Sequence, residues 1–152
     1  MTGPHQPRTQ PLTQPLTQPL THLGIDPALC GEVVALAPGR AELRLTTLAS
    51  MAVDESGLVH GGFVFGLADH AAMLAVNDPN VVLGSADTRF LKPVRVGDTL
   101  TARAECTAAS GRKRSVGVEV LRGDEPVMTG ELTCFVLDGH VLADMSIPPE
   151  NP

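Results

Sequence analysis

The residues in this sequence best suited to chemistry are the triplet His60-Gly61-Gly62 and Asp69, an aspartate seven residues after the last glycine. From Phe63 to Val76 the chain is almost entirely apolar or glycine, and only Asp69 and His70 are polar. This stretch predicts a helix that begins at the glycines, where backbone N–H groups lack intrahelical acceptors. A carboxylate in the middle of an apolar helix is costly to bury unless it is paired or functional. Unpaired donors together with a buried acid favour a hydrolytic site over a purely structural helix.

The elements that position these residues follow from the hydrophobic pattern and from the turns between apolar runs. The helix is expected over Gly61–Asn77, where Asn77-Asp78-Pro79 is a strong stop signal. A hairpin around Pro38-Gly39 precedes it, after one or two helical turns within 20–29, and a loop over 47–57 connects hairpin and helix. The expected strands are Gly31–Leu36, Arg40–Thr46, Val81–Val94, Thr99–Ser110, Arg114–Arg122 and Pro126–Leu137.

One strand pattern indicates the kind of sheet. Leu100, Ala102, Ala104 and Cys106 alternate with polar residues, as in an antiparallel strand with one covered face. One apolar helix and one antiparallel sheet can bury each other only if the sheet curves around the helix. The predicted fold is α+β, a hotdog fold with a curved antiparallel sheet wrapped around a long central helix. Because this layer leaves a sheet edge and part of the helix uncovered, we expect a homodimer or homotetramer.

The same residues resemble those of a known family. The run H-G-G-x-x-x-x-L-A-D-x-A-x-x-x-A-x-N, from His60 to Asn77, is similar to the helix of hotdog-fold acyl-CoA thioesterases of the phenylacetyl-CoA thioesterase type. The downstream segments Asp87–Pro93 and Gly97–Leu100 resemble the strand, turn and strand that follow this helix. The resemblance covers roughly residues 23–138, and the combination of segments is more specific than H-G-G alone.

The resemblance implies hydrolysis of a small-to-medium aryl or aliphatic acyl-CoA, without metal or organic cofactor. The catalytic carboxylate falls on Asp69, as general base or as nucleophile, and the oxyanion donors fall on the backbone at Gly61 and Gly62. His70 departs from the pattern, because relatives usually carry Ser or Thr at that position. The family covers many substrates, so the resemblance does not specify the acyl group.

The spacing of the two groups predicts how the site is assembled. Gly62 and Asp69 are seven residues apart, so they lie on nearly the same face of the helix and about 10 Å apart along its axis. One reacting carbonyl should lie about 3 Å from both the donor and the carboxylate. Two antiparallel helices related by a two-fold axis satisfy this requirement, with Gly62 of one subunit facing Asp69 of the other. We therefore expect two shared sites per dimer.

Other candidates have simpler structural alternatives. His60 is assigned to substrate contact or oxyanion support, with a role in orienting the helix entry as the alternative. Asn77 is a candidate substrate contact, although Asn at a helix end is more often a C-terminal cap. His70 points about 100° away from Asp69 on a helix and is expected to be a packing or interface residue.

Two further groups are candidate substrate contacts. Ser85 and Asp87 share one face of a strand and Thr88 lies on the other. We expect some of them to line the acyl pocket; the alternative is that they are ordinary polar side chains on the surface of the strand. Arg112-Lys113-Arg114 is the only dense basic run of the chain. It is either a solvated turn or the contact for the phosphates of CoA, which suit Arg and Lys.

Composition limits the function classes. The net charge of −6, the pI of about 5.2 and the absence of Trp and Tyr argue against a nucleic-acid partner. No apolar run is long enough to span a bilayer and no signal segment is visible, so we expect a cytoplasmic protein without a membrane partner. Cys30, Cys106 and Cys134 have no C-x-x-C spacing and are interpreted as buried free thiols, a nucleophilic cysteine being the alternative.

The termini are expected to lie outside the folded unit. The unit Thr-Gln-Pro-Leu occurs three times in succession, at 9–12, 13–16 and 17–20, and a proline every fourth residue forbids a helix or a central strand. We therefore predict a disordered tail over 1–20, with a docking peptide as the alternative. The hotdog domain is expected over 21–140, and a flexible C-terminal tail over 141–152.

Two other functions compete with thioester hydrolysis. A hotdog hydratase or dehydratase would use a His and an acid on acyl thioesters, but its usual helix entry differs from the one in this chain. A non-catalytic acyl-CoA-binding protein is the third hypothesis. Such modules are usually joined to a DNA-binding segment, and the N-terminus here carries only the repeats.

Overall fold

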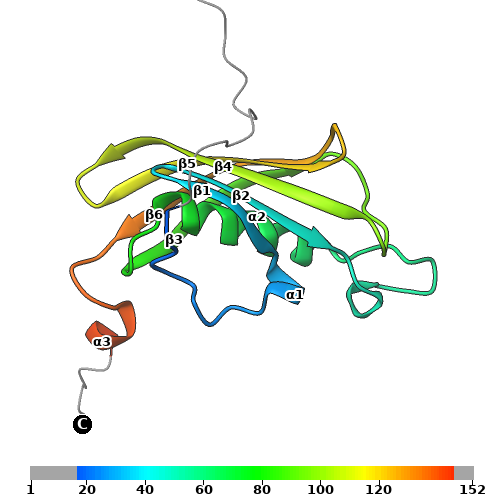
Figure 1. Cartoon of the computed structure of the whole chain (residues 1–152), viewed down its shortest axis with the longest axis horizontal. Helices are drawn as coiled ribbons and strands as arrows, with labels where there is room; N and C mark the ends of the chain where they lie inside the picture. The colour runs from blue at the N-terminus through cyan, green and yellow to red at the C-terminus, as the bar shows by residue number, and fades with distance from the viewer. Residues whose placement is uncertain (1–16, 146–152) are drawn as a thin grey trace, which may run out of the picture.

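The described part of the chain, residues 17–145 of a computed structural model, is built from one long helix and one antiparallel sheet. The sheet has six strands in the order β1-β2-β4-β5-β6-β3. In Figure 1 the strands form a curved layer above the helix α2, and the short helices α1 and α3 lie below that layer. This arrangement confirms the predicted α+β hotdog fold.

The element boundaries follow the predicted ones closely. The helices are α1 (Pro27–Cys30), α2 (Gly61–Val76) and α3 (Val141–Met145), with a 3₁₀ turn, η1, at Ala49–Met51. The strands are β1 (Glu32–Ala37), β2 (Arg40–Thr46), β3 (Val81–Phe90), β4 (Thr99–Ser110), β5 (Lys113–Arg122) and β6 (Glu125–Val136).

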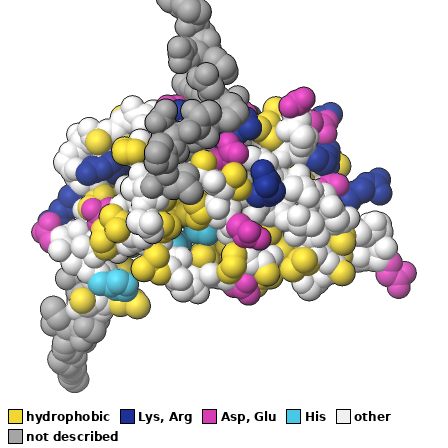
Figure 2. Space-filling model, in the orientation of Figure 1, with side chains coloured by type: hydrophobic (Ala, Val, Ile, Leu, Met, Phe, Trp, Pro, Cys, Tyr) yellow, Lys and Arg dark blue, Asp and Glu magenta, His cyan; other side chains and the backbone are white. Residues whose placement is uncertain are grey.

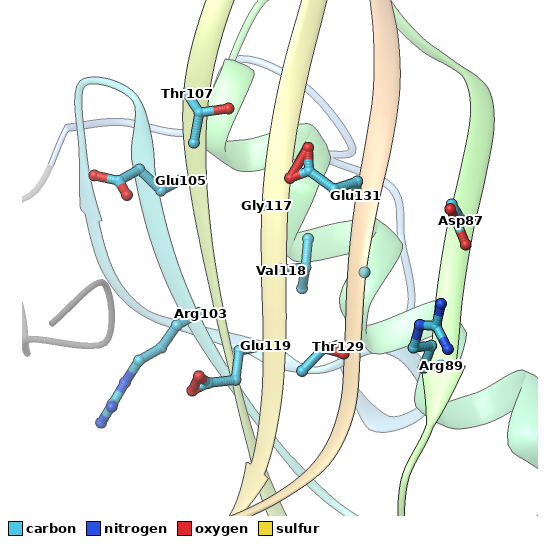
Figure 3. Close-up of a pocket in the computed structure, with 11 residues that line it drawn as sticks. Asp87, Arg89, Arg103, Glu105, Thr107, Gly117, Val118, Glu119, Thr129 and Glu131 are labelled. Carbon is cyan, nitrogen blue, oxygen red and sulfur yellow. The ribbon is translucent and has the colours of Figure 1, made fainter.

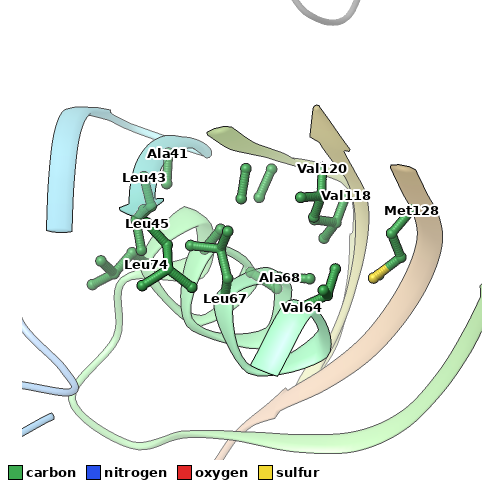
Figure 4. Packing of buried hydrophobic residues seen from close by; sticks show 14 of the residues in the cluster. Ala41, Leu43, Leu45, Val64, Leu67, Ala68, Leu74, Val118, Val120 and Met128 are labelled. Carbon is green, nitrogen blue, oxygen red and sulfur yellow. The ribbon is translucent and has the colours of Figure 1, made fainter. Parts of the chain in front are cut away.

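The core lies between α2 and the sheet. Apolar side chains of α2 point toward the strands and meet those of β2, β5 and β6 (Figure 4). The helix ends at Asn77, which adopts the left-handed conformation (φ 52°) and donates its N–H to Met73 O. Burial of this apolar face holds α2 against the sheet, because the hydrophobic gain exceeds what helix propensity supplies. The largest α2 core side chains are Val64, Leu67, Met73 and Leu74.

β3 ends earlier than predicted. The sequence suggested a strand over 81–94, but the strand stops at Phe90. The next two amides, of Leu91 and Lys92, both point to Val127 O, at 2.8 and 3.4 Å. Pro93 then has no N–H to continue the ladder. The chain turns here toward α2, and Val59 donates to Val94 O at 2.8 Å, which brings this segment beside the start of the helix.

The structure describes a part of each predicted tail. Residues 17–20, which the sequence assigned to the N-terminal tail, hydrogen bond to the domain through Leu36 and Asn77. Residues 141–145, assigned to the C-terminal tail, form α3. The remainder of both predicted tails, 1–16 and 146–152, lies outside the described residues.

The two ends of the sheet are open. Among residues 17–145, strands β1 and β3 each pair with one strand only, β2 and β6 respectively, and β1 also accepts one hydrogen bond from Thr17 N at Leu36 O. Most of β3 from Gly84 to Phe90 is exposed. An exposed edge strand of this length presents unpaired backbone groups to a second chain. None of the helices among residues 17–145 is both long and apolar enough to cross a membrane.

Candidate active site

The N-terminus of α2 presents free backbone donors. The N–H groups of Gly61 and Gly62 belong to the first helical turn and have no intrahelical acceptor. His60, the residue before the helix, makes no side-chain cap. Its exposed ring instead lies beside the first turn, with its centroid 6.0 Å from that of Phe63 in an edge-on arrangement. A Cβ atom at Gly62 would lie only 2.9 Å from His60 Nε2, so glycine keeps this turn open.

Asp69 lies two turns further along α2. Its Oδ1 atom is buried and has no hydrogen-bond partner among the described residues. Burial raises the pKa of this carboxyl above its usual range, as expected for a carboxylate that loses water without gaining a partner. The charge of Asp69 also contributes to the raised pKa of the Cys30 and Cys134 thiols, although burial is the larger cause for both. An unpaired, partly desolvated carboxylate of this kind is typical of a functional site.

One stripe of α2 is not covered by the sheet. Gly62 is exposed, and Phe65, Gly66 and Asp69 are half-buried, whereas Leu67 and Ala68 are fully buried. A Cβ atom at Gly66 would meet nothing within 4 Å. Gly66 lies between Gly62 and Asp69 on this face, and sequence reasoning missed it. The signal was present, because Gly-x-x-x-Gly-x-x-Asp places all three residues on one helix face.

An apolar hollow of about 260 Å³ opens beside the start of α2. Its walls include Gly61 and Val64 of the helix, Val127 of β6, and Phe90 and Leu91 at the end of β3. Phe90 and Leu91 are 54% and 47% exposed, so the hollow has an apolar rim. This hollow can receive an apolar group attached to a carbonyl held at the helix N-terminus.

The β3 candidates divide between the two faces of the sheet. Thr88 pairs with Gly130 and lies on the α2 side, where its Cγ2 would be 2.8 Å from a Cβ atom at Gly130. Asp87 and Ser85 point the other way, as the predicted alternation required. The structure therefore does not bring Ser85 and Asp87 together with Gly62, and neither belongs to a site at the start of α2.

Asp87 belongs to a separate hollow of about 320 Å³ on the outer face of the sheet. Figure 3 shows side chains from β3, β4, β5 and β6 around it, with acidic and basic groups in neighbouring positions. Glu119 in this hollow has a raised pKa, because burial outweighs the opposing charge of Arg103. The sheet separates the hollow from α2, so a carbonyl at Gly62 cannot reach it.

The basic run lies at the other end of the molecule from Gly62. Arg112 is in the turn between β4 and β5 and forms an ion pair with Asp138. Lys113 starts β5, and Arg114 donates to Gly111 O at 2.7 Å. This turn adjoins the end of β6, since Val136 donates to Arg112 O, and α2 also ends there. Within one chain the run is therefore too far from the helix N-terminus to contact the same small group.

Two polar residues of α2 have structural partners instead. His70 is buried, and its Nδ1 lies 3.1 Å from Cys30 O at the end of α1. The side chain of Asn77 accepts from Leu20 N and donates to Gln18 O, at 2.8 and 2.9 Å. His70 is thus a packing residue, as expected. Asn77 is a helix cap and an anchor for the N-terminal segment, so it too is left out of the site.

The cysteines and possible metal ligands add no second centre. Only Cys134 is fully buried; Cys30 and Cys106 are half-buried, which differs from the predicted burial of all three. Burial raises the pKa of Cys134 to about 12, so this thiol stays protonated and is a poor nucleophile. Among residues 17–145, no group of three or more His, Cys, Asp or Glu side chains is arranged to hold a metal ion.

Comparison with known proteins agrees with this geometry. The model of the thioesterase superfamily matches residues 56–129, which include α2 and most of the sheet. The chain is 34% identical to the phenylacetic acid degradation protein PaaI from Thermus thermophilus, with a TM-score of 0.66 over 72% of this chain and 96% of that one. The chain belongs to the hotdog-fold thioesterase superfamily.

Other proteins to which the chain is similar carry different names. An uncharacterized protein, PH1136 from Pyrococcus horikoshii, is 50% identical, with a TM-score of 0.84 over 85% of this chain and 99% of that one. A methylthioribose-1-phosphate isomerase from Aquifex aeolicus is 50% identical over 118 residues, which are 77% of this chain but 26% of that protein. A transcription factor FapR from Thermoanaerobacter is 26% identical over 76% of this chain and 58% of its own length. The chain thus spans less than two thirds of these two curated relatives.

Proposed function

We propose that this member of the thioesterase superfamily hydrolyses acyl-CoA thioesters at sites shared between two subunits. The observation that carries the proposal is the buried, unpartnered Oδ1 of Asp69 on the same uncovered stripe of α2 as the free amides of Gly61 and Gly62. A carboxylate without a partner is costly unless a substrate or a water molecule occupies the space in front of it. Membership of the superfamily and similarity to PaaI support the same reaction class.

The groups on the stripe suffice for hydrolysis. Water attacks the thioester carbonyl carbon while Asp69 accepts one proton, and the carbonyl electrons move to oxygen. The N–H groups at Gly61 and Gly62, at the positive end of the helix dipole, stabilise the oxyanion. Collapse breaks the C–S bond, and Asp69 returns the proton to the departing CoA sulfur. Direct attack by Asp69, through an acyl-aspartyl anhydride, would use the same groups.

Sharing between subunits follows from distance and from the open surfaces. Gly62 and Asp69 are about 10 Å apart along a straight helix, so one carbonyl cannot contact both in the same chain. The free edge of β3 allows a second sheet to continue the first, which brings two α2 helices side by side in antiparallel directions. The open space at Gly66 lets these helices approach closely. Gly62 of the partner subunit then faces Asp69.

The same arrangement assigns roles to the other candidates. The apolar hollow at Phe90 and Val127 takes a small-to-medium acyl group. We assign His60, which precedes Gly61, and Thr88, which lies on the same face of β3 as Phe90, to the approaches of this hollow. An antiparallel partner places its helix N-terminus toward the end of the molecule that carries Arg112-Lys113-Arg114. We assign this run to the phosphates of CoA bound mainly by the partner subunit.

Thiol release from a panel of acyl-CoAs tests the reaction. Wild type should release CoA from at least one short or aryl acyl-CoA, and Asp69→Asn should lower kcat about a hundredfold or more. Asp124→Asn is the matched control, because it makes the same change in the exposed turn between β5 and β6. A wild-type protein that releases no thiol from any acyl-CoA would overturn the proposal. An active Asp69→Asn would remove Asp69 from its role.

Mixing variants tests the shared site. Asp69→Asn and Gly62→Val should each be inactive as homodimers, because each destroys one half of both sites. Subunits exchanged at equal amounts should recover about a quarter of wild-type activity, since half of the dimers are mixed and each contains one intact site. Mixtures that stay inactive after verified exchange would show that donor and carboxylate act within one chain.

A non-catalytic acyl-CoA-binding role is the second candidate. The similarity to proteins named transcription factor FapR favours it, because that name describes a regulator and not an enzyme. Calorimetric binding of acyl-CoA with no thiol release over hours would identify the chain as a binding module. Turnover in wild type together with unchanged acyl-CoA affinity in Asp69→Asn would identify it as an enzyme.

A further inference from the structure

The N-terminal segment is held by a small clamp built on Asn77. The side-chain oxygen of Asn77 accepts from Leu20 N at 2.8 Å, and its amide donates to Gln18 O at 2.9 Å. Thr17 N donates to Leu36 O at 2.9 Å, on the strand β1 at the edge of the sheet. Asn77 is itself fixed as the cap of α2. Three hydrogen bonds therefore fasten four consecutive residues to the domain.

The clamp contacts the backbone of residues 17–20 and makes no hydrogen bond to their side chains. All three hydrogen bonds use main-chain N–H or C=O groups of the segment. Gln18 and Leu20 are exposed, whereas Thr21, the next residue, is 8% exposed. Pro19 lies between the two groups that Asn77 contacts and has no N–H to leave unpaired. The unit that fits is therefore Thr-Gln-Pro-Leu followed by a buried Thr.

The sequence contains this five-residue unit three times. Thr-Gln-Pro-Leu-Thr occurs at 9–13, 13–17 and 17–21, sharing the threonines. A shift of the segment by four or eight residues presents the same backbone groups, the same proline and the same threonine to the clamp. None of these contacts distinguishes the third copy from the first or the second.

His22 is the first residue that differs between the copies. It follows the third unit, whereas Gln14 and Gln18 follow the first and the second. The His22 ring stacks on His70 of α2, with centroids 5.9 Å apart and planes 19° from parallel. Its Nδ1 lies 2.9 Å from Thr21 Oγ1. Glutamine cannot reproduce this ring stack, so it is the contact that separates the three registers.

We propose that the Asn77 clamp is a docking site for any of the three repeats, and that the His22–His70 stack selects the third. Its occupants are named segments of this chain, at 9–12, 13–16 and 17–20. This inference does not depend on the proposed thioesterase activity. Slippage by one unit lengthens the turn before α1 by four residues and withdraws the same length from the N-terminal arm.

The fold can accommodate the extra residues. Leu23 and Gly24, which follow the stack, are exposed, and Leu23 is 75% accessible. A surface turn of this kind tolerates insertion at small entropic cost. The turn borders a hollow of about 520 Å³ that is also lined by Val81 of β3 and His140. Figure 2 shows hydrophobic and histidine side chains together on this side of the molecule. A change of register would therefore replace the ring of His22 by Gln18 at the wall of this hollow.

Residue-resolved amide hydrogen exchange on the full chain tests the proposal. In wild type, the amide of Leu20 should be protected and that of Leu16 should exchange freely. Leu20→Pro removes the donor that Asn77 needs, so the Leu16 amide should become protected, by up to about twofold, because the first and second copies then share the clamp equally. Leu12→Pro is the matched control, because it disables only the first copy and should leave Leu20 protected as in wild type.

Two further variants test the Asn77 clamp and the His22–His70 stack separately. Asn77→Ala should abolish protection at both Leu16 and Leu20, in wild type and in Leu20→Pro. His22→Gln should reduce Leu20 protection to below about twofold, because each register is then occupied about a third of the time. Exchange at Leu67 in α2 should be unchanged throughout, which shows that the domain remains folded. Free exchange of Leu16 in Leu20→Pro would overturn the proposal.

Discussion

At the residue scale, the two glycines at the start of α2 are not equivalent. A Cβ atom at Gly62 would lie 2.9 and 3.0 Å from ring atoms of His60, whereas one at Gly61 would meet Phe90 at 3.6 Å, an ordinary contact. The ring of His60 is thus placed against the open side of Gly62. This difference distinguishes two neighbouring residues that the sequence treats alike.

Alanine substitution at each glycine should separate their roles. Gly62→Ala should lower kcat/KM about tenfold, equivalent to about 1.4 kcal/mol, because the methyl group displaces His60 and enters the space in front of the donors. Gly61→Ala should change kcat/KM by less than about threefold, since its methyl group fits against Phe90. Steady-state kinetics on the best acyl-CoA checks both values. Equal losses at the two positions would show that His60 and the space beside Gly62 do not matter.

The ionised side chain of Asp69 should lower the stability of the folded protein, although it is needed for activity. Its pKa is raised by burial, so the folded state binds a proton more readily than the unfolded state. Stability therefore decreases as pH rises through the range between the unfolded and the folded pKa, and at neutral pH the ionised carboxylate is destabilising. Asp69→Asn should raise Tm at pH 7 by a few degrees while it lowers kcat about a hundredfold or more.

The pH dependence checks the same argument. The Tm difference between Asp69→Asn and wild type should diminish below the ordinary pKa of Asp, about 3.8, where both side chains are neutral. In wild type, kcat/KM should fall on the acid side with a midpoint above this value, because only the carboxylate is active. A midpoint at or below 3.8, or a destabilised Asp69→Asn at pH 7, would contradict the assignment.

At the element scale, most of the architecture could be predicted because it rests on local signals. Alternation in Thr99–Ser110, the run from Gly61 to the Asn77 cap, and glycine turns each fix an element without knowledge of its neighbours. The end of β3 could not be predicted, since it depends on Val127 O accepting from both Leu91 and Lys92. The anchoring of residues 17–20 was missed for a related reason, because Asn77 is 57 residues from Leu20.

The candidate site could be predicted only where its residues share one element. Gly62 and Asp69 were found because both lie on α2, where spacing determines the face. Ser85 and Asp87 were named as candidates for an acyl pocket. The strand pattern shows that these two residues share a face, but it does not show which face of the strand packs against the helix. That information comes from the register with β6, which directs Asp87 to the outer hollow.

Gly66 tests the uncovered stripe of α2 as an element. Gly66→Ala should raise the free energy of unfolding by about 1 kcal/mol, because alanine favours helix and the space beside Gly66 is empty within the chain. Gly66→Leu should fold equally well but lower activity at least tenfold, since it fills the space assigned to the partner helix. Denaturant unfolding and thiol release measure the two effects. Full activity in Gly66→Leu would mean that no partner helix approaches there.

At the scale of the whole molecule, the two halves of the proposed site depend on the free edge of β3. N–H groups along an edge strand alternate between its paired neighbour and open solvent. Of the adjacent variants Ala86→Pro and Asp87→Pro, one therefore removes a bond to β6 and the other removes only an outward donor. The variant that loses only an outward donor leaves the protomer intact but prevents another sheet from pairing with this edge.

The variant of this pair that keeps a wild-type Tm should be the informative one. It should sediment as a monomer where wild type sediments as a dimer or larger, and its activity should fall at least a hundredfold, because Asp69 would then face no oxyanion donors. The other variant should lose several degrees in Tm, since it breaks a ladder bond of β3. Analytical ultracentrifugation, thermal unfolding and thiol release on the same samples make the comparison. A folded, monomeric and fully active variant would show that one chain holds a complete site.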